Sequence, residues 1–374
     1  MAARTWATVD VSAVRHNVRL AREIVGPGVG VAAVVKAEAY GHGAAPVARA
    51  ALEAGAAALV VANAQEGVEL RGAGLDAPII VIGASLTCDA EAIVAHGLAA
   101  SLSPPAMLDA IQAEARRQGR KARVHLMVDL GMRRDGVTWD EALELASRLV
   151  AAREVELEGV ASHFPTADSE DTRFAERQIA EFARLVADVS AIGLRPRYAH
   201  LAASAAILRL PQSHFNLVRL GILLYGMSPL PRTAMATLAG WQPVLSWRAR
   251  VVYLRRVAAG TEVGYGHTYV TPRATVLATL PVGYYDGYLR AYSNNADVLI
   301  HGRRVPVVGR VSMDYVTVDV GDVPEAAVGD VATLIGRDGA ECIRAEELAE
   351  RRGTIPYEVT CAIGPRVRRI YVEA

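Results

Sequence analysis

Short apolar runs recur along the first 230 residues, and stretches with apolar residues at helical spacing separate them. The runs are rich in Val, Ile, Leu and Ala and do not alternate with polar residues, which is typical of parallel strands covered on both faces. Eight runs fit this description: residues 31–35, 58–63, 78–83, 98–103, 123–129, 156–163, 197–203 and 216–226.

Eight strands that alternate with helices predict a (β/α)8 barrel. An open doubly wound sheet is the alternative architecture, but no GxGxxG motif follows the first run. The stretch 171–193 carries apolar residues at helical spacing and ends at Gly193, shortly before Pro196, which indicates a long helix between two of the strands.

The pattern changes after about residue 235. Strand-like segments follow, separated by turn signals such as His301-Gly302 and Asp338-Gly339, with one helical stretch at residues 345–353. We therefore predict an α/β chain of two domains. The barrel would cover residues 10–235, and a mainly β domain would cover residues 236–374, with the N-terminal segment 1–9 joined to it.

Composition narrows the choice of partners. The chain has 374 residues with 40 Lys and Arg against 40 Asp and Glu, so no overall field favours nucleic acid or an anionic membrane. Three cysteines lie far apart, which fits free, mostly buried thiols in a reducing compartment. Because the first residues lack an apolar signal and no apolar run reaches about 18 residues, we expect a cytoplasmic protein.

The candidate chemistry begins with Lys36, which directly follows the first predicted strand in the segment AVVKAEAYGHG, residues 33–43. Active sites of such barrels lie at the carboxyl ends of the strands. Burial there lowers the pKa of a lysine and makes its amine a nucleophile toward carbonyls. Taken alone, however, a lysine at a strand end more often only reaches for solvent.

An anion-binding pattern lies at the ends of the last two predicted strands. Ser204 opens a short helical stretch, and RLGILLYG offers the backbone N–H groups of Gly221 and Ile222, which suit a phosphate. Each residue alone also fits a plain helix cap or a packing glycine. A nucleophilic lysine and a phosphate cradle on one barrel rim together indicate pyridoxal phosphate, held covalently by the lysine.

Together these segments resemble a known family. AVVKAEAYGHG, VDLGMRR, SHF, HLAASAAIL, VRLGILLYG, EVGYGHTY, PVGYYDGY, GRVSMDY, TIPYEV and GPRV are similar, in this order and spacing, to segments of pyridoxal-phosphate-dependent alanine racemases. The resemblance covers nearly the whole chain. It implies an isomerase that acts on a small amino acid, as a homodimer whose subunits share their active sites.

The resemblance also implies residue roles. Lys36 would carry the cofactor and act as one base, and Tyr265 would act as the second base in the partner subunit's site. The implied cofactor contacts besides Lys36 are Tyr40, His163, Ser204, Arg219, Gly221, Ile222 and Tyr357. The implied substrate contacts are Arg134, Met313 and Tyr284, and the implied supporting residues are His200 and Asp314. No histidine–carboxylate cluster has metal-ligand spacing, so no metal is expected.

The residue types suit racemisation. Lysine and tyrosine have nearly matched reference pKa values of about 10.4 and 10, as a reaction between enantiomers of equal free energy requires. Arg219 would oppose a second positive charge at the cofactor's pyridine nitrogen, which disfavours transamination and decarboxylation.

Several positions depart from the usual family sequence. Met127 stands where the family commonly has a lysine, often carbamylated, whose charge would position Arg134. We expect Glu38 or Asp135 to replace that missing anion. The other departures are Ala203, Leu220, Tyr285, Leu289 and Ser312.

These departures leave alternatives to alanine racemisation open. One is a racemase of serine or another small amino acid in specialised metabolism. The others are a retro-aldolase or decarboxylase that uses the same cofactor, and a non-catalytic carrier of pyridoxal phosphate.

Overall fold

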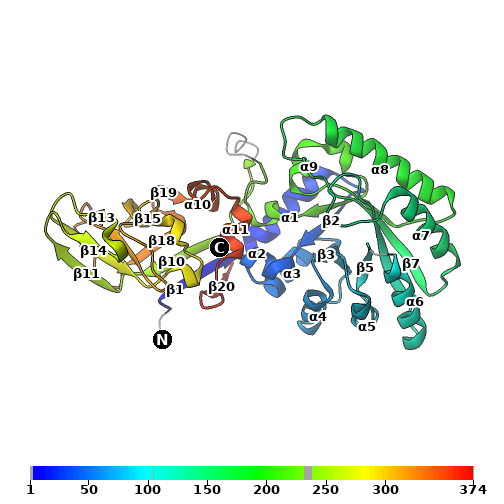
Figure 1. Ribbon diagram of the computed structural model, residues 1–374, viewed down its shortest axis with the longest axis horizontal. Coiled ribbons are helices and arrows are strands. Elements are labelled where there is room, and N and C mark those ends of the chain that lie inside the picture. Colours follow the sequence, from blue (N-terminus) through cyan, green and yellow to red (C-terminus); the bar gives the residue numbers. More distant parts are fainter. Residues whose placement is uncertain (1–2, 104, 231–237, 374) are drawn as a thin grey trace.

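The computed structural model describes residues 3–103, 105–230 and 238–373. Figure 1 shows two bodies: strands surrounded by helices, coloured blue to green, and a sheet-rich part that contains the yellow and orange segments. The predicted boundary between residues 235 and 236 lies outside the described residues. Within the described part of the chain, no helix is both long and apolar enough to span a membrane.

The first body is built on a parallel eight-stranded sheet in the order β8-β7-β6-β5-β4-β3-β2-β9. Its strands are β2 (Gly30–Val34), β3 (Ala58–Val61), β4 (Ile79–Val81), β5 (Ala99–Leu102), β6 (Ala122–Met127), β7 (Val155–Ala161), β8 (Tyr198–His200) and β9 (Leu217–Leu220). At the seam between β8 and β9, the backbone N–H of Arg219 donates to the carbonyl of Ala202 at 3.0 Å. Every predicted run overlaps one of these strands, although β2, β6 and β7 each begin one residue before the predicted run. The predicted barrel is confirmed.

Helices follow the strands around the outside of the barrel (Figure 1). They are α1 (Val11–Val25), α3 (Ala44–Glu53), α4 (Ala64–Gly72), α5 (Ala90–Ala95), α6 (Ala106–Gln118), α7 (Trp139–Ala151), α8 (Arg173–Ala191) and α9 (Ser204–Arg209). α7 begins with a reciprocal cap between Thr138 and Glu141. The predicted long helix is α8, which buries Phe182, Leu185 and Val189 against the barrel core.

The last predicted strand, residues 216–226, is wrong in its second half. β9 ends at Leu220, and Ile222–Tyr225 form a 3-10 helix, η3, that begins at Gly221. The stretch is mostly apolar because both pieces are buried, so hydrophobicity alone does not reveal the turn between them. The break leaves the backbone of Gly221 at the carboxyl end of the barrel.

The second body contains a seven-stranded sheet, a three-stranded sheet and a two-stranded sheet. The large sheet consists of β1 (Thr5–Asp10), β10 (Leu245–Arg250), β15 (Asp297–Ile300), β16 (Arg303–Pro306), β18 (Val331–Asp338), β19 (Glu341–Ile343) and β20 (Arg368–Val372). The small sheets consist of β11 (Tyr253–Val257), β14 (Thr275–Leu280) and β17 (Val316–Asp319), and of β12 (Glu262–Val263) and β13 (Tyr269–Val270). β1 pairs with β10 and β20, so the two ends of the chain lie in one sheet.

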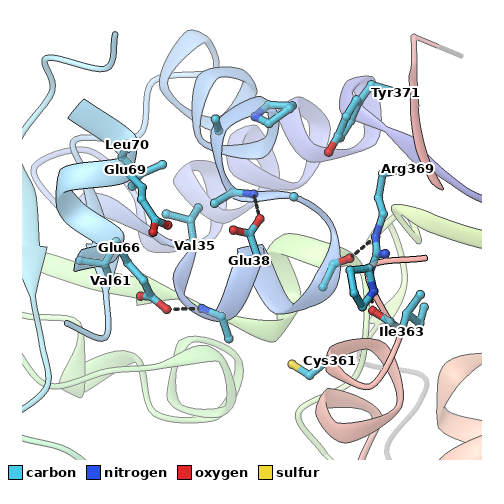
Figure 2. A pocket seen from close by; sticks show the side chains of 17 residues that line it. Val35, Glu38, Val61, Glu66, Glu69, Leu70, Cys361, Ile363, Arg369 and Tyr371 are labelled. Atoms are coloured by element: carbon cyan, nitrogen blue, oxygen red, sulfur yellow. Dashed lines mark hydrogen bonds between the residues drawn. The ribbon is translucent and has the colours of Figure 1, made fainter. Parts of the chain in front are cut away.

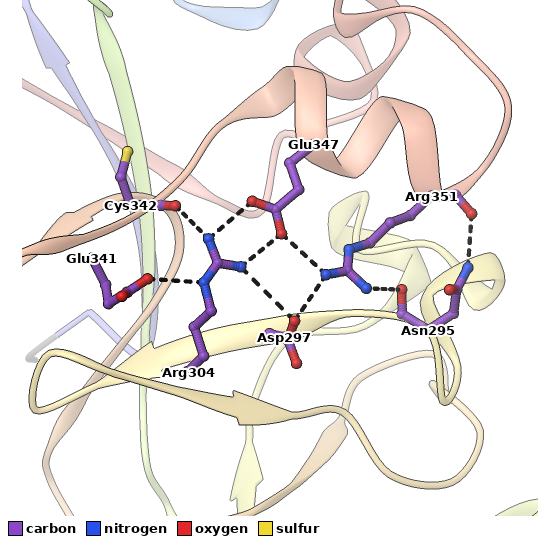
Figure 3. Close-up of polar contacts among 7 residues, drawn as sticks. All are labelled: Asn295, Asp297, Arg304, Glu341, Cys342, Glu347 and Arg351. Carbon is purple, nitrogen blue, oxygen red and sulfur yellow. Dashed lines mark hydrogen bonds and ion pairs between the residues drawn. The ribbon is translucent and has the colours of Figure 1, made fainter. Parts of the chain in front are cut away.

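In its described residues this body has two α-helices, α10 (Ala345–Arg351) and α11 (Pro356–Cys361). α10 was predicted, and an ion-pair network fastens it to β15 and β16 (Figure 3). Arg304 pairs with Glu347 at 2.7 Å, and Arg351 pairs with Asp297 at 2.9 Å. α11 was not predicted, and it carries Tyr357 to the barrel.

Candidate active site

A cavity of about 550 Å³ opens at the carboxyl ends of the barrel strands. Most of the residues predicted for cofactor and substrate line it: Lys36, Tyr40, Arg134, His163, Ser204, Arg219, Gly221 and Tyr357. They come from β9, from loops and helices that follow barrel strands, and from α11 of the second body. Its other lining residues include Met127, Asp135, Ala203 and Cys361.

Lys36 begins α2 (Lys36–Gly41), directly after the buried strand β2. Burial lowers the pKa of the Lys36 amine, and the positive charge of Arg134 lowers it further. A lowered pKa raises the fraction of the neutral, nucleophilic amine at neutral pH.

α2 itself is a left-handed helical turn. Ala37, Glu38, Ala39 and Tyr40 all have φ between 51° and 53°. This conformation costs about 1–2 kcal/mol for each residue with a Cβ, so the surroundings must hold it. The carboxylate of Glu66 accepts hydrogen bonds from the backbone N–H groups of Ala37 at 2.8 Å and of Ala62 at 2.7 Å.

Hydroxyl groups converge at one end of the cavity. The backbone N–H of Gly221 donates to the Ser204 hydroxyl at 3.0 Å, and the rings of Tyr40 and Tyr357 lie 5.5 Å apart. A Cβ at Gly221 would stand 3.3 Å from the Tyr40 oxygen and 3.4 Å from the Ser204 oxygen. Burial raises the pKa of both tyrosines, so each keeps a proton to donate. The Ile222 side chain is buried, and its backbone follows Gly221 at the start of η3.

Arg219 lies buried at the cavity wall, where its guanidinium makes several hydrogen bonds. It donates to His200 Nδ1 at 2.8 Å and to His163 Nδ1 at 3.0 Å, and also to the backbone carbonyls of Ser162, His200 and Leu201. Burial, and then the Arg219 charge, lower the pKa of His163 to about 3 and that of His200 well below its usual value. Both imidazoles are therefore neutral acceptors.

Asp135 and Glu38, the two carboxylates considered as partners of Arg134, line different cavities. Asp135 lines the Lys36 cavity, and its Oδ1 lies 3.5 Å from Arg134 Nε. Glu38 instead lines a second cavity, of about 840 Å³, beside α2 (Figure 2). There its carboxylate accepts a hydrogen bond from the backbone N–H of Ala44 at 3.2 Å. Of the two, Asp135 is the carboxylate beside Arg134.

Apart from Tyr357, the predicted site residues of the second body do not line this cavity. Tyr265 is 71% exposed in a short turn between β12 and β13, and Figure 1 shows β13 at the end of the molecule away from the barrel. Tyr284 and Met313 are also exposed. Asp314 accepts a hydrogen bond from Arg366 at 2.8 Å.

Sequence reasoning missed other features. The three cysteines are free, but the expectation of mostly buried thiols is wrong, because Cys88 and Cys361 are exposed. Cys361 lies at the rim of the Lys36 cavity, since the unpredicted helix α11 ends there. Among the residues that the structure describes, no cluster of histidine, cysteine and carboxylate side chains is arranged to hold a metal ion.

Family models cover almost all of the chain. A model of the alanine racemase N-terminal domain matches residues 9–229, and one of the alanine racemase C-terminal domain matches residues 244–371. The chain belongs to the alanine racemase family. The predicted enzyme class, an isomerase of the alanine racemase type, is confirmed.

Full-length relatives support the assignment to the alanine racemase family. The alanine racemase of Symbiobacterium thermophilum is 45% identical over 367 residues, which cover 98% of this chain and 97% of that protein. The crystal structure of alanine racemase from Bacillus anthracis with bound L-Ala-P matches with a TM-score of 0.92 at 38% identity, covering 100% of this chain and 96% of that one.

A third relative bears on the cofactor. The crystal structure of alanine racemase from Bartonella henselae with covalently bound pyridoxal phosphate matches with a TM-score of 0.88 at 29% identity, and the match covers 99% of this chain and 100% of that one. The family is pyridoxal-phosphate-dependent.

Proposed function

We propose that the chain interconverts L- and D-alanine with pyridoxal phosphate, using Lys36 and Tyr265 of the partner subunit as the two bases. Family membership supports the reaction. The observation that supports this site most strongly is the convergence of Lys36, Arg219 and the phosphate-type donors in one cavity of about 550 Å³.

The residues present fit the cofactor. The hydroxyls of Tyr40 and Ser204 approach Gly221 so closely that a Cβ there would crowd both, and a small backbone surface between hydroxyl donors suits a phosphate. At the barrel rim, the amine of Lys36 has a lowered pKa, as addition to an aldehyde requires. Tyr357 and the backbone of Ile222 would complete the phosphate contacts, and His163 would lie against the ring.

When bound, pyridoxal phosphate acidifies the Cα–H bond of an amino acid joined to it. Lys36 would remove or return the proton at Cα on one face, and Tyr265 of the partner subunit would do so on the opposite face. Arg219 would face the pyridine nitrogen, with His200 holding its guanidinium. Because a guanidinium keeps its proton, it opposes protonation of that nitrogen and so favours racemisation over transamination.

A homodimer follows from this assignment. Tyr265 is exposed and absent from the lining of the chain's own Lys36 cavity, so it can serve only the cavity of a second copy. Tyr284 and Met313 are also exposed, and they too would contact the substrate in the partner subunit's cavity. Asp314 would hold their loop through Arg366.

Arg134 would bind the substrate carboxylate, with Asp135 beside it. Met127 also lines the cavity, where its thioether carries no charge to help orient the arginine. Asp135 is therefore the anion proposed to position Arg134.

Deuterium incorporation tests the reaction. The purified protein is incubated with L-alanine in heavy water, and L-serine is the parallel substrate. We expect D-alanine with deuterium at Cα, formed faster than D-serine. Release of carbon dioxide or an aldehyde, or the absence of deuterium from recovered alanine, would contradict the proposal; faster exchange of serine would reassign the substrate.

A further inference from the structure

Buried hydrogen bonds continue from Arg219 away from the cavity, through the interior of the barrel. Arg219 on β9 donates to His200 Nδ1 on β8 at 2.8 Å, and His200 Nε2 lies 2.8 Å from Nδ1 of His125 on β6. His125 Nε2 lies 3.3 Å from the carboxylate of Glu158 on β7. Each of these four side chains is at most 4% exposed. We call this set of four residues the histidine relay.

The histidine relay has one direction of donation. A guanidinium can only donate, so His200 Nδ1 accepts and the His200 proton sits on Nε2. That N–H donates to His125 Nδ1, which places the His125 proton on Nε2, facing Glu158. Although burial raises the pKa of Glu158, the hydrogen bond from His125 and nearby positive charges lower it overall, so the last member is an acceptor-only carboxylate.

The barrel wall is shaped around His125. On β7 the residue opposite His125 is Gly159, and a Cβ there would overlap the ring at Nδ1, the atom that accepts from His200. The register between β6 and β7 also shifts between Val124 and His125. The backbone thus makes room for the ring in the orientation that the relay requires.

The charge of Arg219 explains how the histidine relay would act. Among the described residues, the guanidinium of Arg219 donates to two neutral imidazoles and three backbone carbonyls, and no carboxylate in this set neutralises its charge by direct contact. Burial, followed by the charge of Arg134, lowers the pKa of Arg219 to about 10. A carboxylate held two imidazoles away stabilises the cation without covering the face that it presents to the cavity.

We propose that Glu158 and His125 are positioning residues for Arg219. The Glu158 carboxylate fixes both histidine tautomers through hydrogen bonds and so holds the guanidinium charged and directed at the cavity. This inference rests on the proposed function, in which Arg219 faces the pyridine nitrogen of the cofactor.

Nitrogen NMR of the full-length protein, as purified and labelled with ¹⁵N-histidine, tests the relay together with kinetics. In the wild type we expect the signals of His125 and His200 to report single Nε2–H tautomers. Glu158→Gln removes the charge at nearly constant size, and its amide can accept or donate. It should therefore shift both signals and lower kcat for alanine roughly tenfold, the scale at which partners of a site residue act, with KM nearly unchanged.

The matched control is Glu156→Gln, which removes an exposed carboxylate two residues earlier on the same strand and should change neither readout. His125→Asn is the second variant, because its amide oxygen can still accept from His200 while the link to Glu158 is cut. His125→Asn should also lower kcat for alanine roughly tenfold. It therefore tests the relay independently if Glu158→Gln fails to fold.

An unchanged His200 signal in the folded variants, or a shifted signal with wild-type kcat, would overturn the inference. A wild-type protein that does not racemise alanine would instead refute the proposed function, while the histidine signals would still report on the relay.

Discussion

At the scale of single residues, the site depends on where each charge is held. Lys36, Arg134 and Arg219 bring three cationic side chains to one cavity, and burial and mutual repulsion lower the pKa of both Lys36 and Arg219. Asp135 offsets part of this repulsion, because its charge raises the pKa values of Lys36 and Arg219. A cavity rich in such donors suits a ligand that brings a phosphate and a carboxylate.

The assignment of Asp135 as the partner of Arg134 gives a prediction about substrate binding. Asp135→Asn should raise KM for alanine by roughly two- to fivefold, because a half-exposed ion pair contributes up to about 1 kcal/mol. Glu38→Gln is the matched control, since its carboxylate lies in the other cavity, and it should leave KM unchanged. Steady-state kinetics of both variants measures these KM values. A larger increase in KM for Glu38→Gln than for Asp135→Asn would make Glu38 the partner of Arg134.

The sequence indicated which side chains gather at this cavity, but for the carboxylate beside Arg134 it left both Glu38 and Asp135 as candidates. Lys36, Ser204 and Arg219 lie close to the carboxyl ends of β2, β8 and β9, and parallel strands bring such positions to one rim. Glu38 and Asp135 both lie in loops or turns beyond a strand, where side-chain direction depends on the local backbone. The left-handed turn of α2 places Glu38 in the second cavity, and no periodicity in the sequence encodes that turn.

At the scale of elements, the second body supports α2. α11 and β20 contact it: the side chain of Arg369 donates to the carbonyl of Gly41 at 3.0 Å, and Gly41 lies against the backbone of Thr360. Neither α11 nor the left-handed turn was predicted, because the first is a single short helix and the second is an unfavourable conformation held by tertiary contacts. The barrel strands were predictable because their burial on both faces requires continuous apolar runs.

This packing gives a prediction for two glycines. Gly41 and Gly28 both have positive φ, but a Cβ at Gly41 would overlap the Thr360 carbonyl, whereas nothing lies within 4 Å of one at Gly28. Gly28→Ala should lower the free energy of unfolding by about 1 kcal/mol, and Gly41→Ala by about 3 kcal/mol or more, because α2 and α11 must also move apart.

Chemical denaturation of both variants measures the difference. Gly41→Ala should also retain less cofactor, since α2 carries Lys36 and Tyr40. Equal losses of stability in the two variants would show that the contact between α2 and α11 contributes nothing.

At the scale of the whole molecule, the two proposed bases of one chain lie in different bodies. The barrel carries the amine, and the far part of the second body carries the phenol, exposed beside β13 (Figure 1). Within the second body, ion pairs join α10 to the strands β15 and β16 (Figure 3). Sequence resemblance implies this division, in which a single chain would contain only one side of each site.

A hybrid dimer tests the shared site most directly. One subunit carries Lys36→Ala and the other Tyr265→Phe, each with a different affinity tag, and the hybrid is purified through both tags. In the hybrid, one cavity lacks both bases and the other keeps the wild-type Lys36 and receives the wild-type Tyr265. We expect both parent homodimers to be nearly inactive and the hybrid to have about half of the wild-type racemisation rate. A hybrid as inactive as its parents would contradict the shared site.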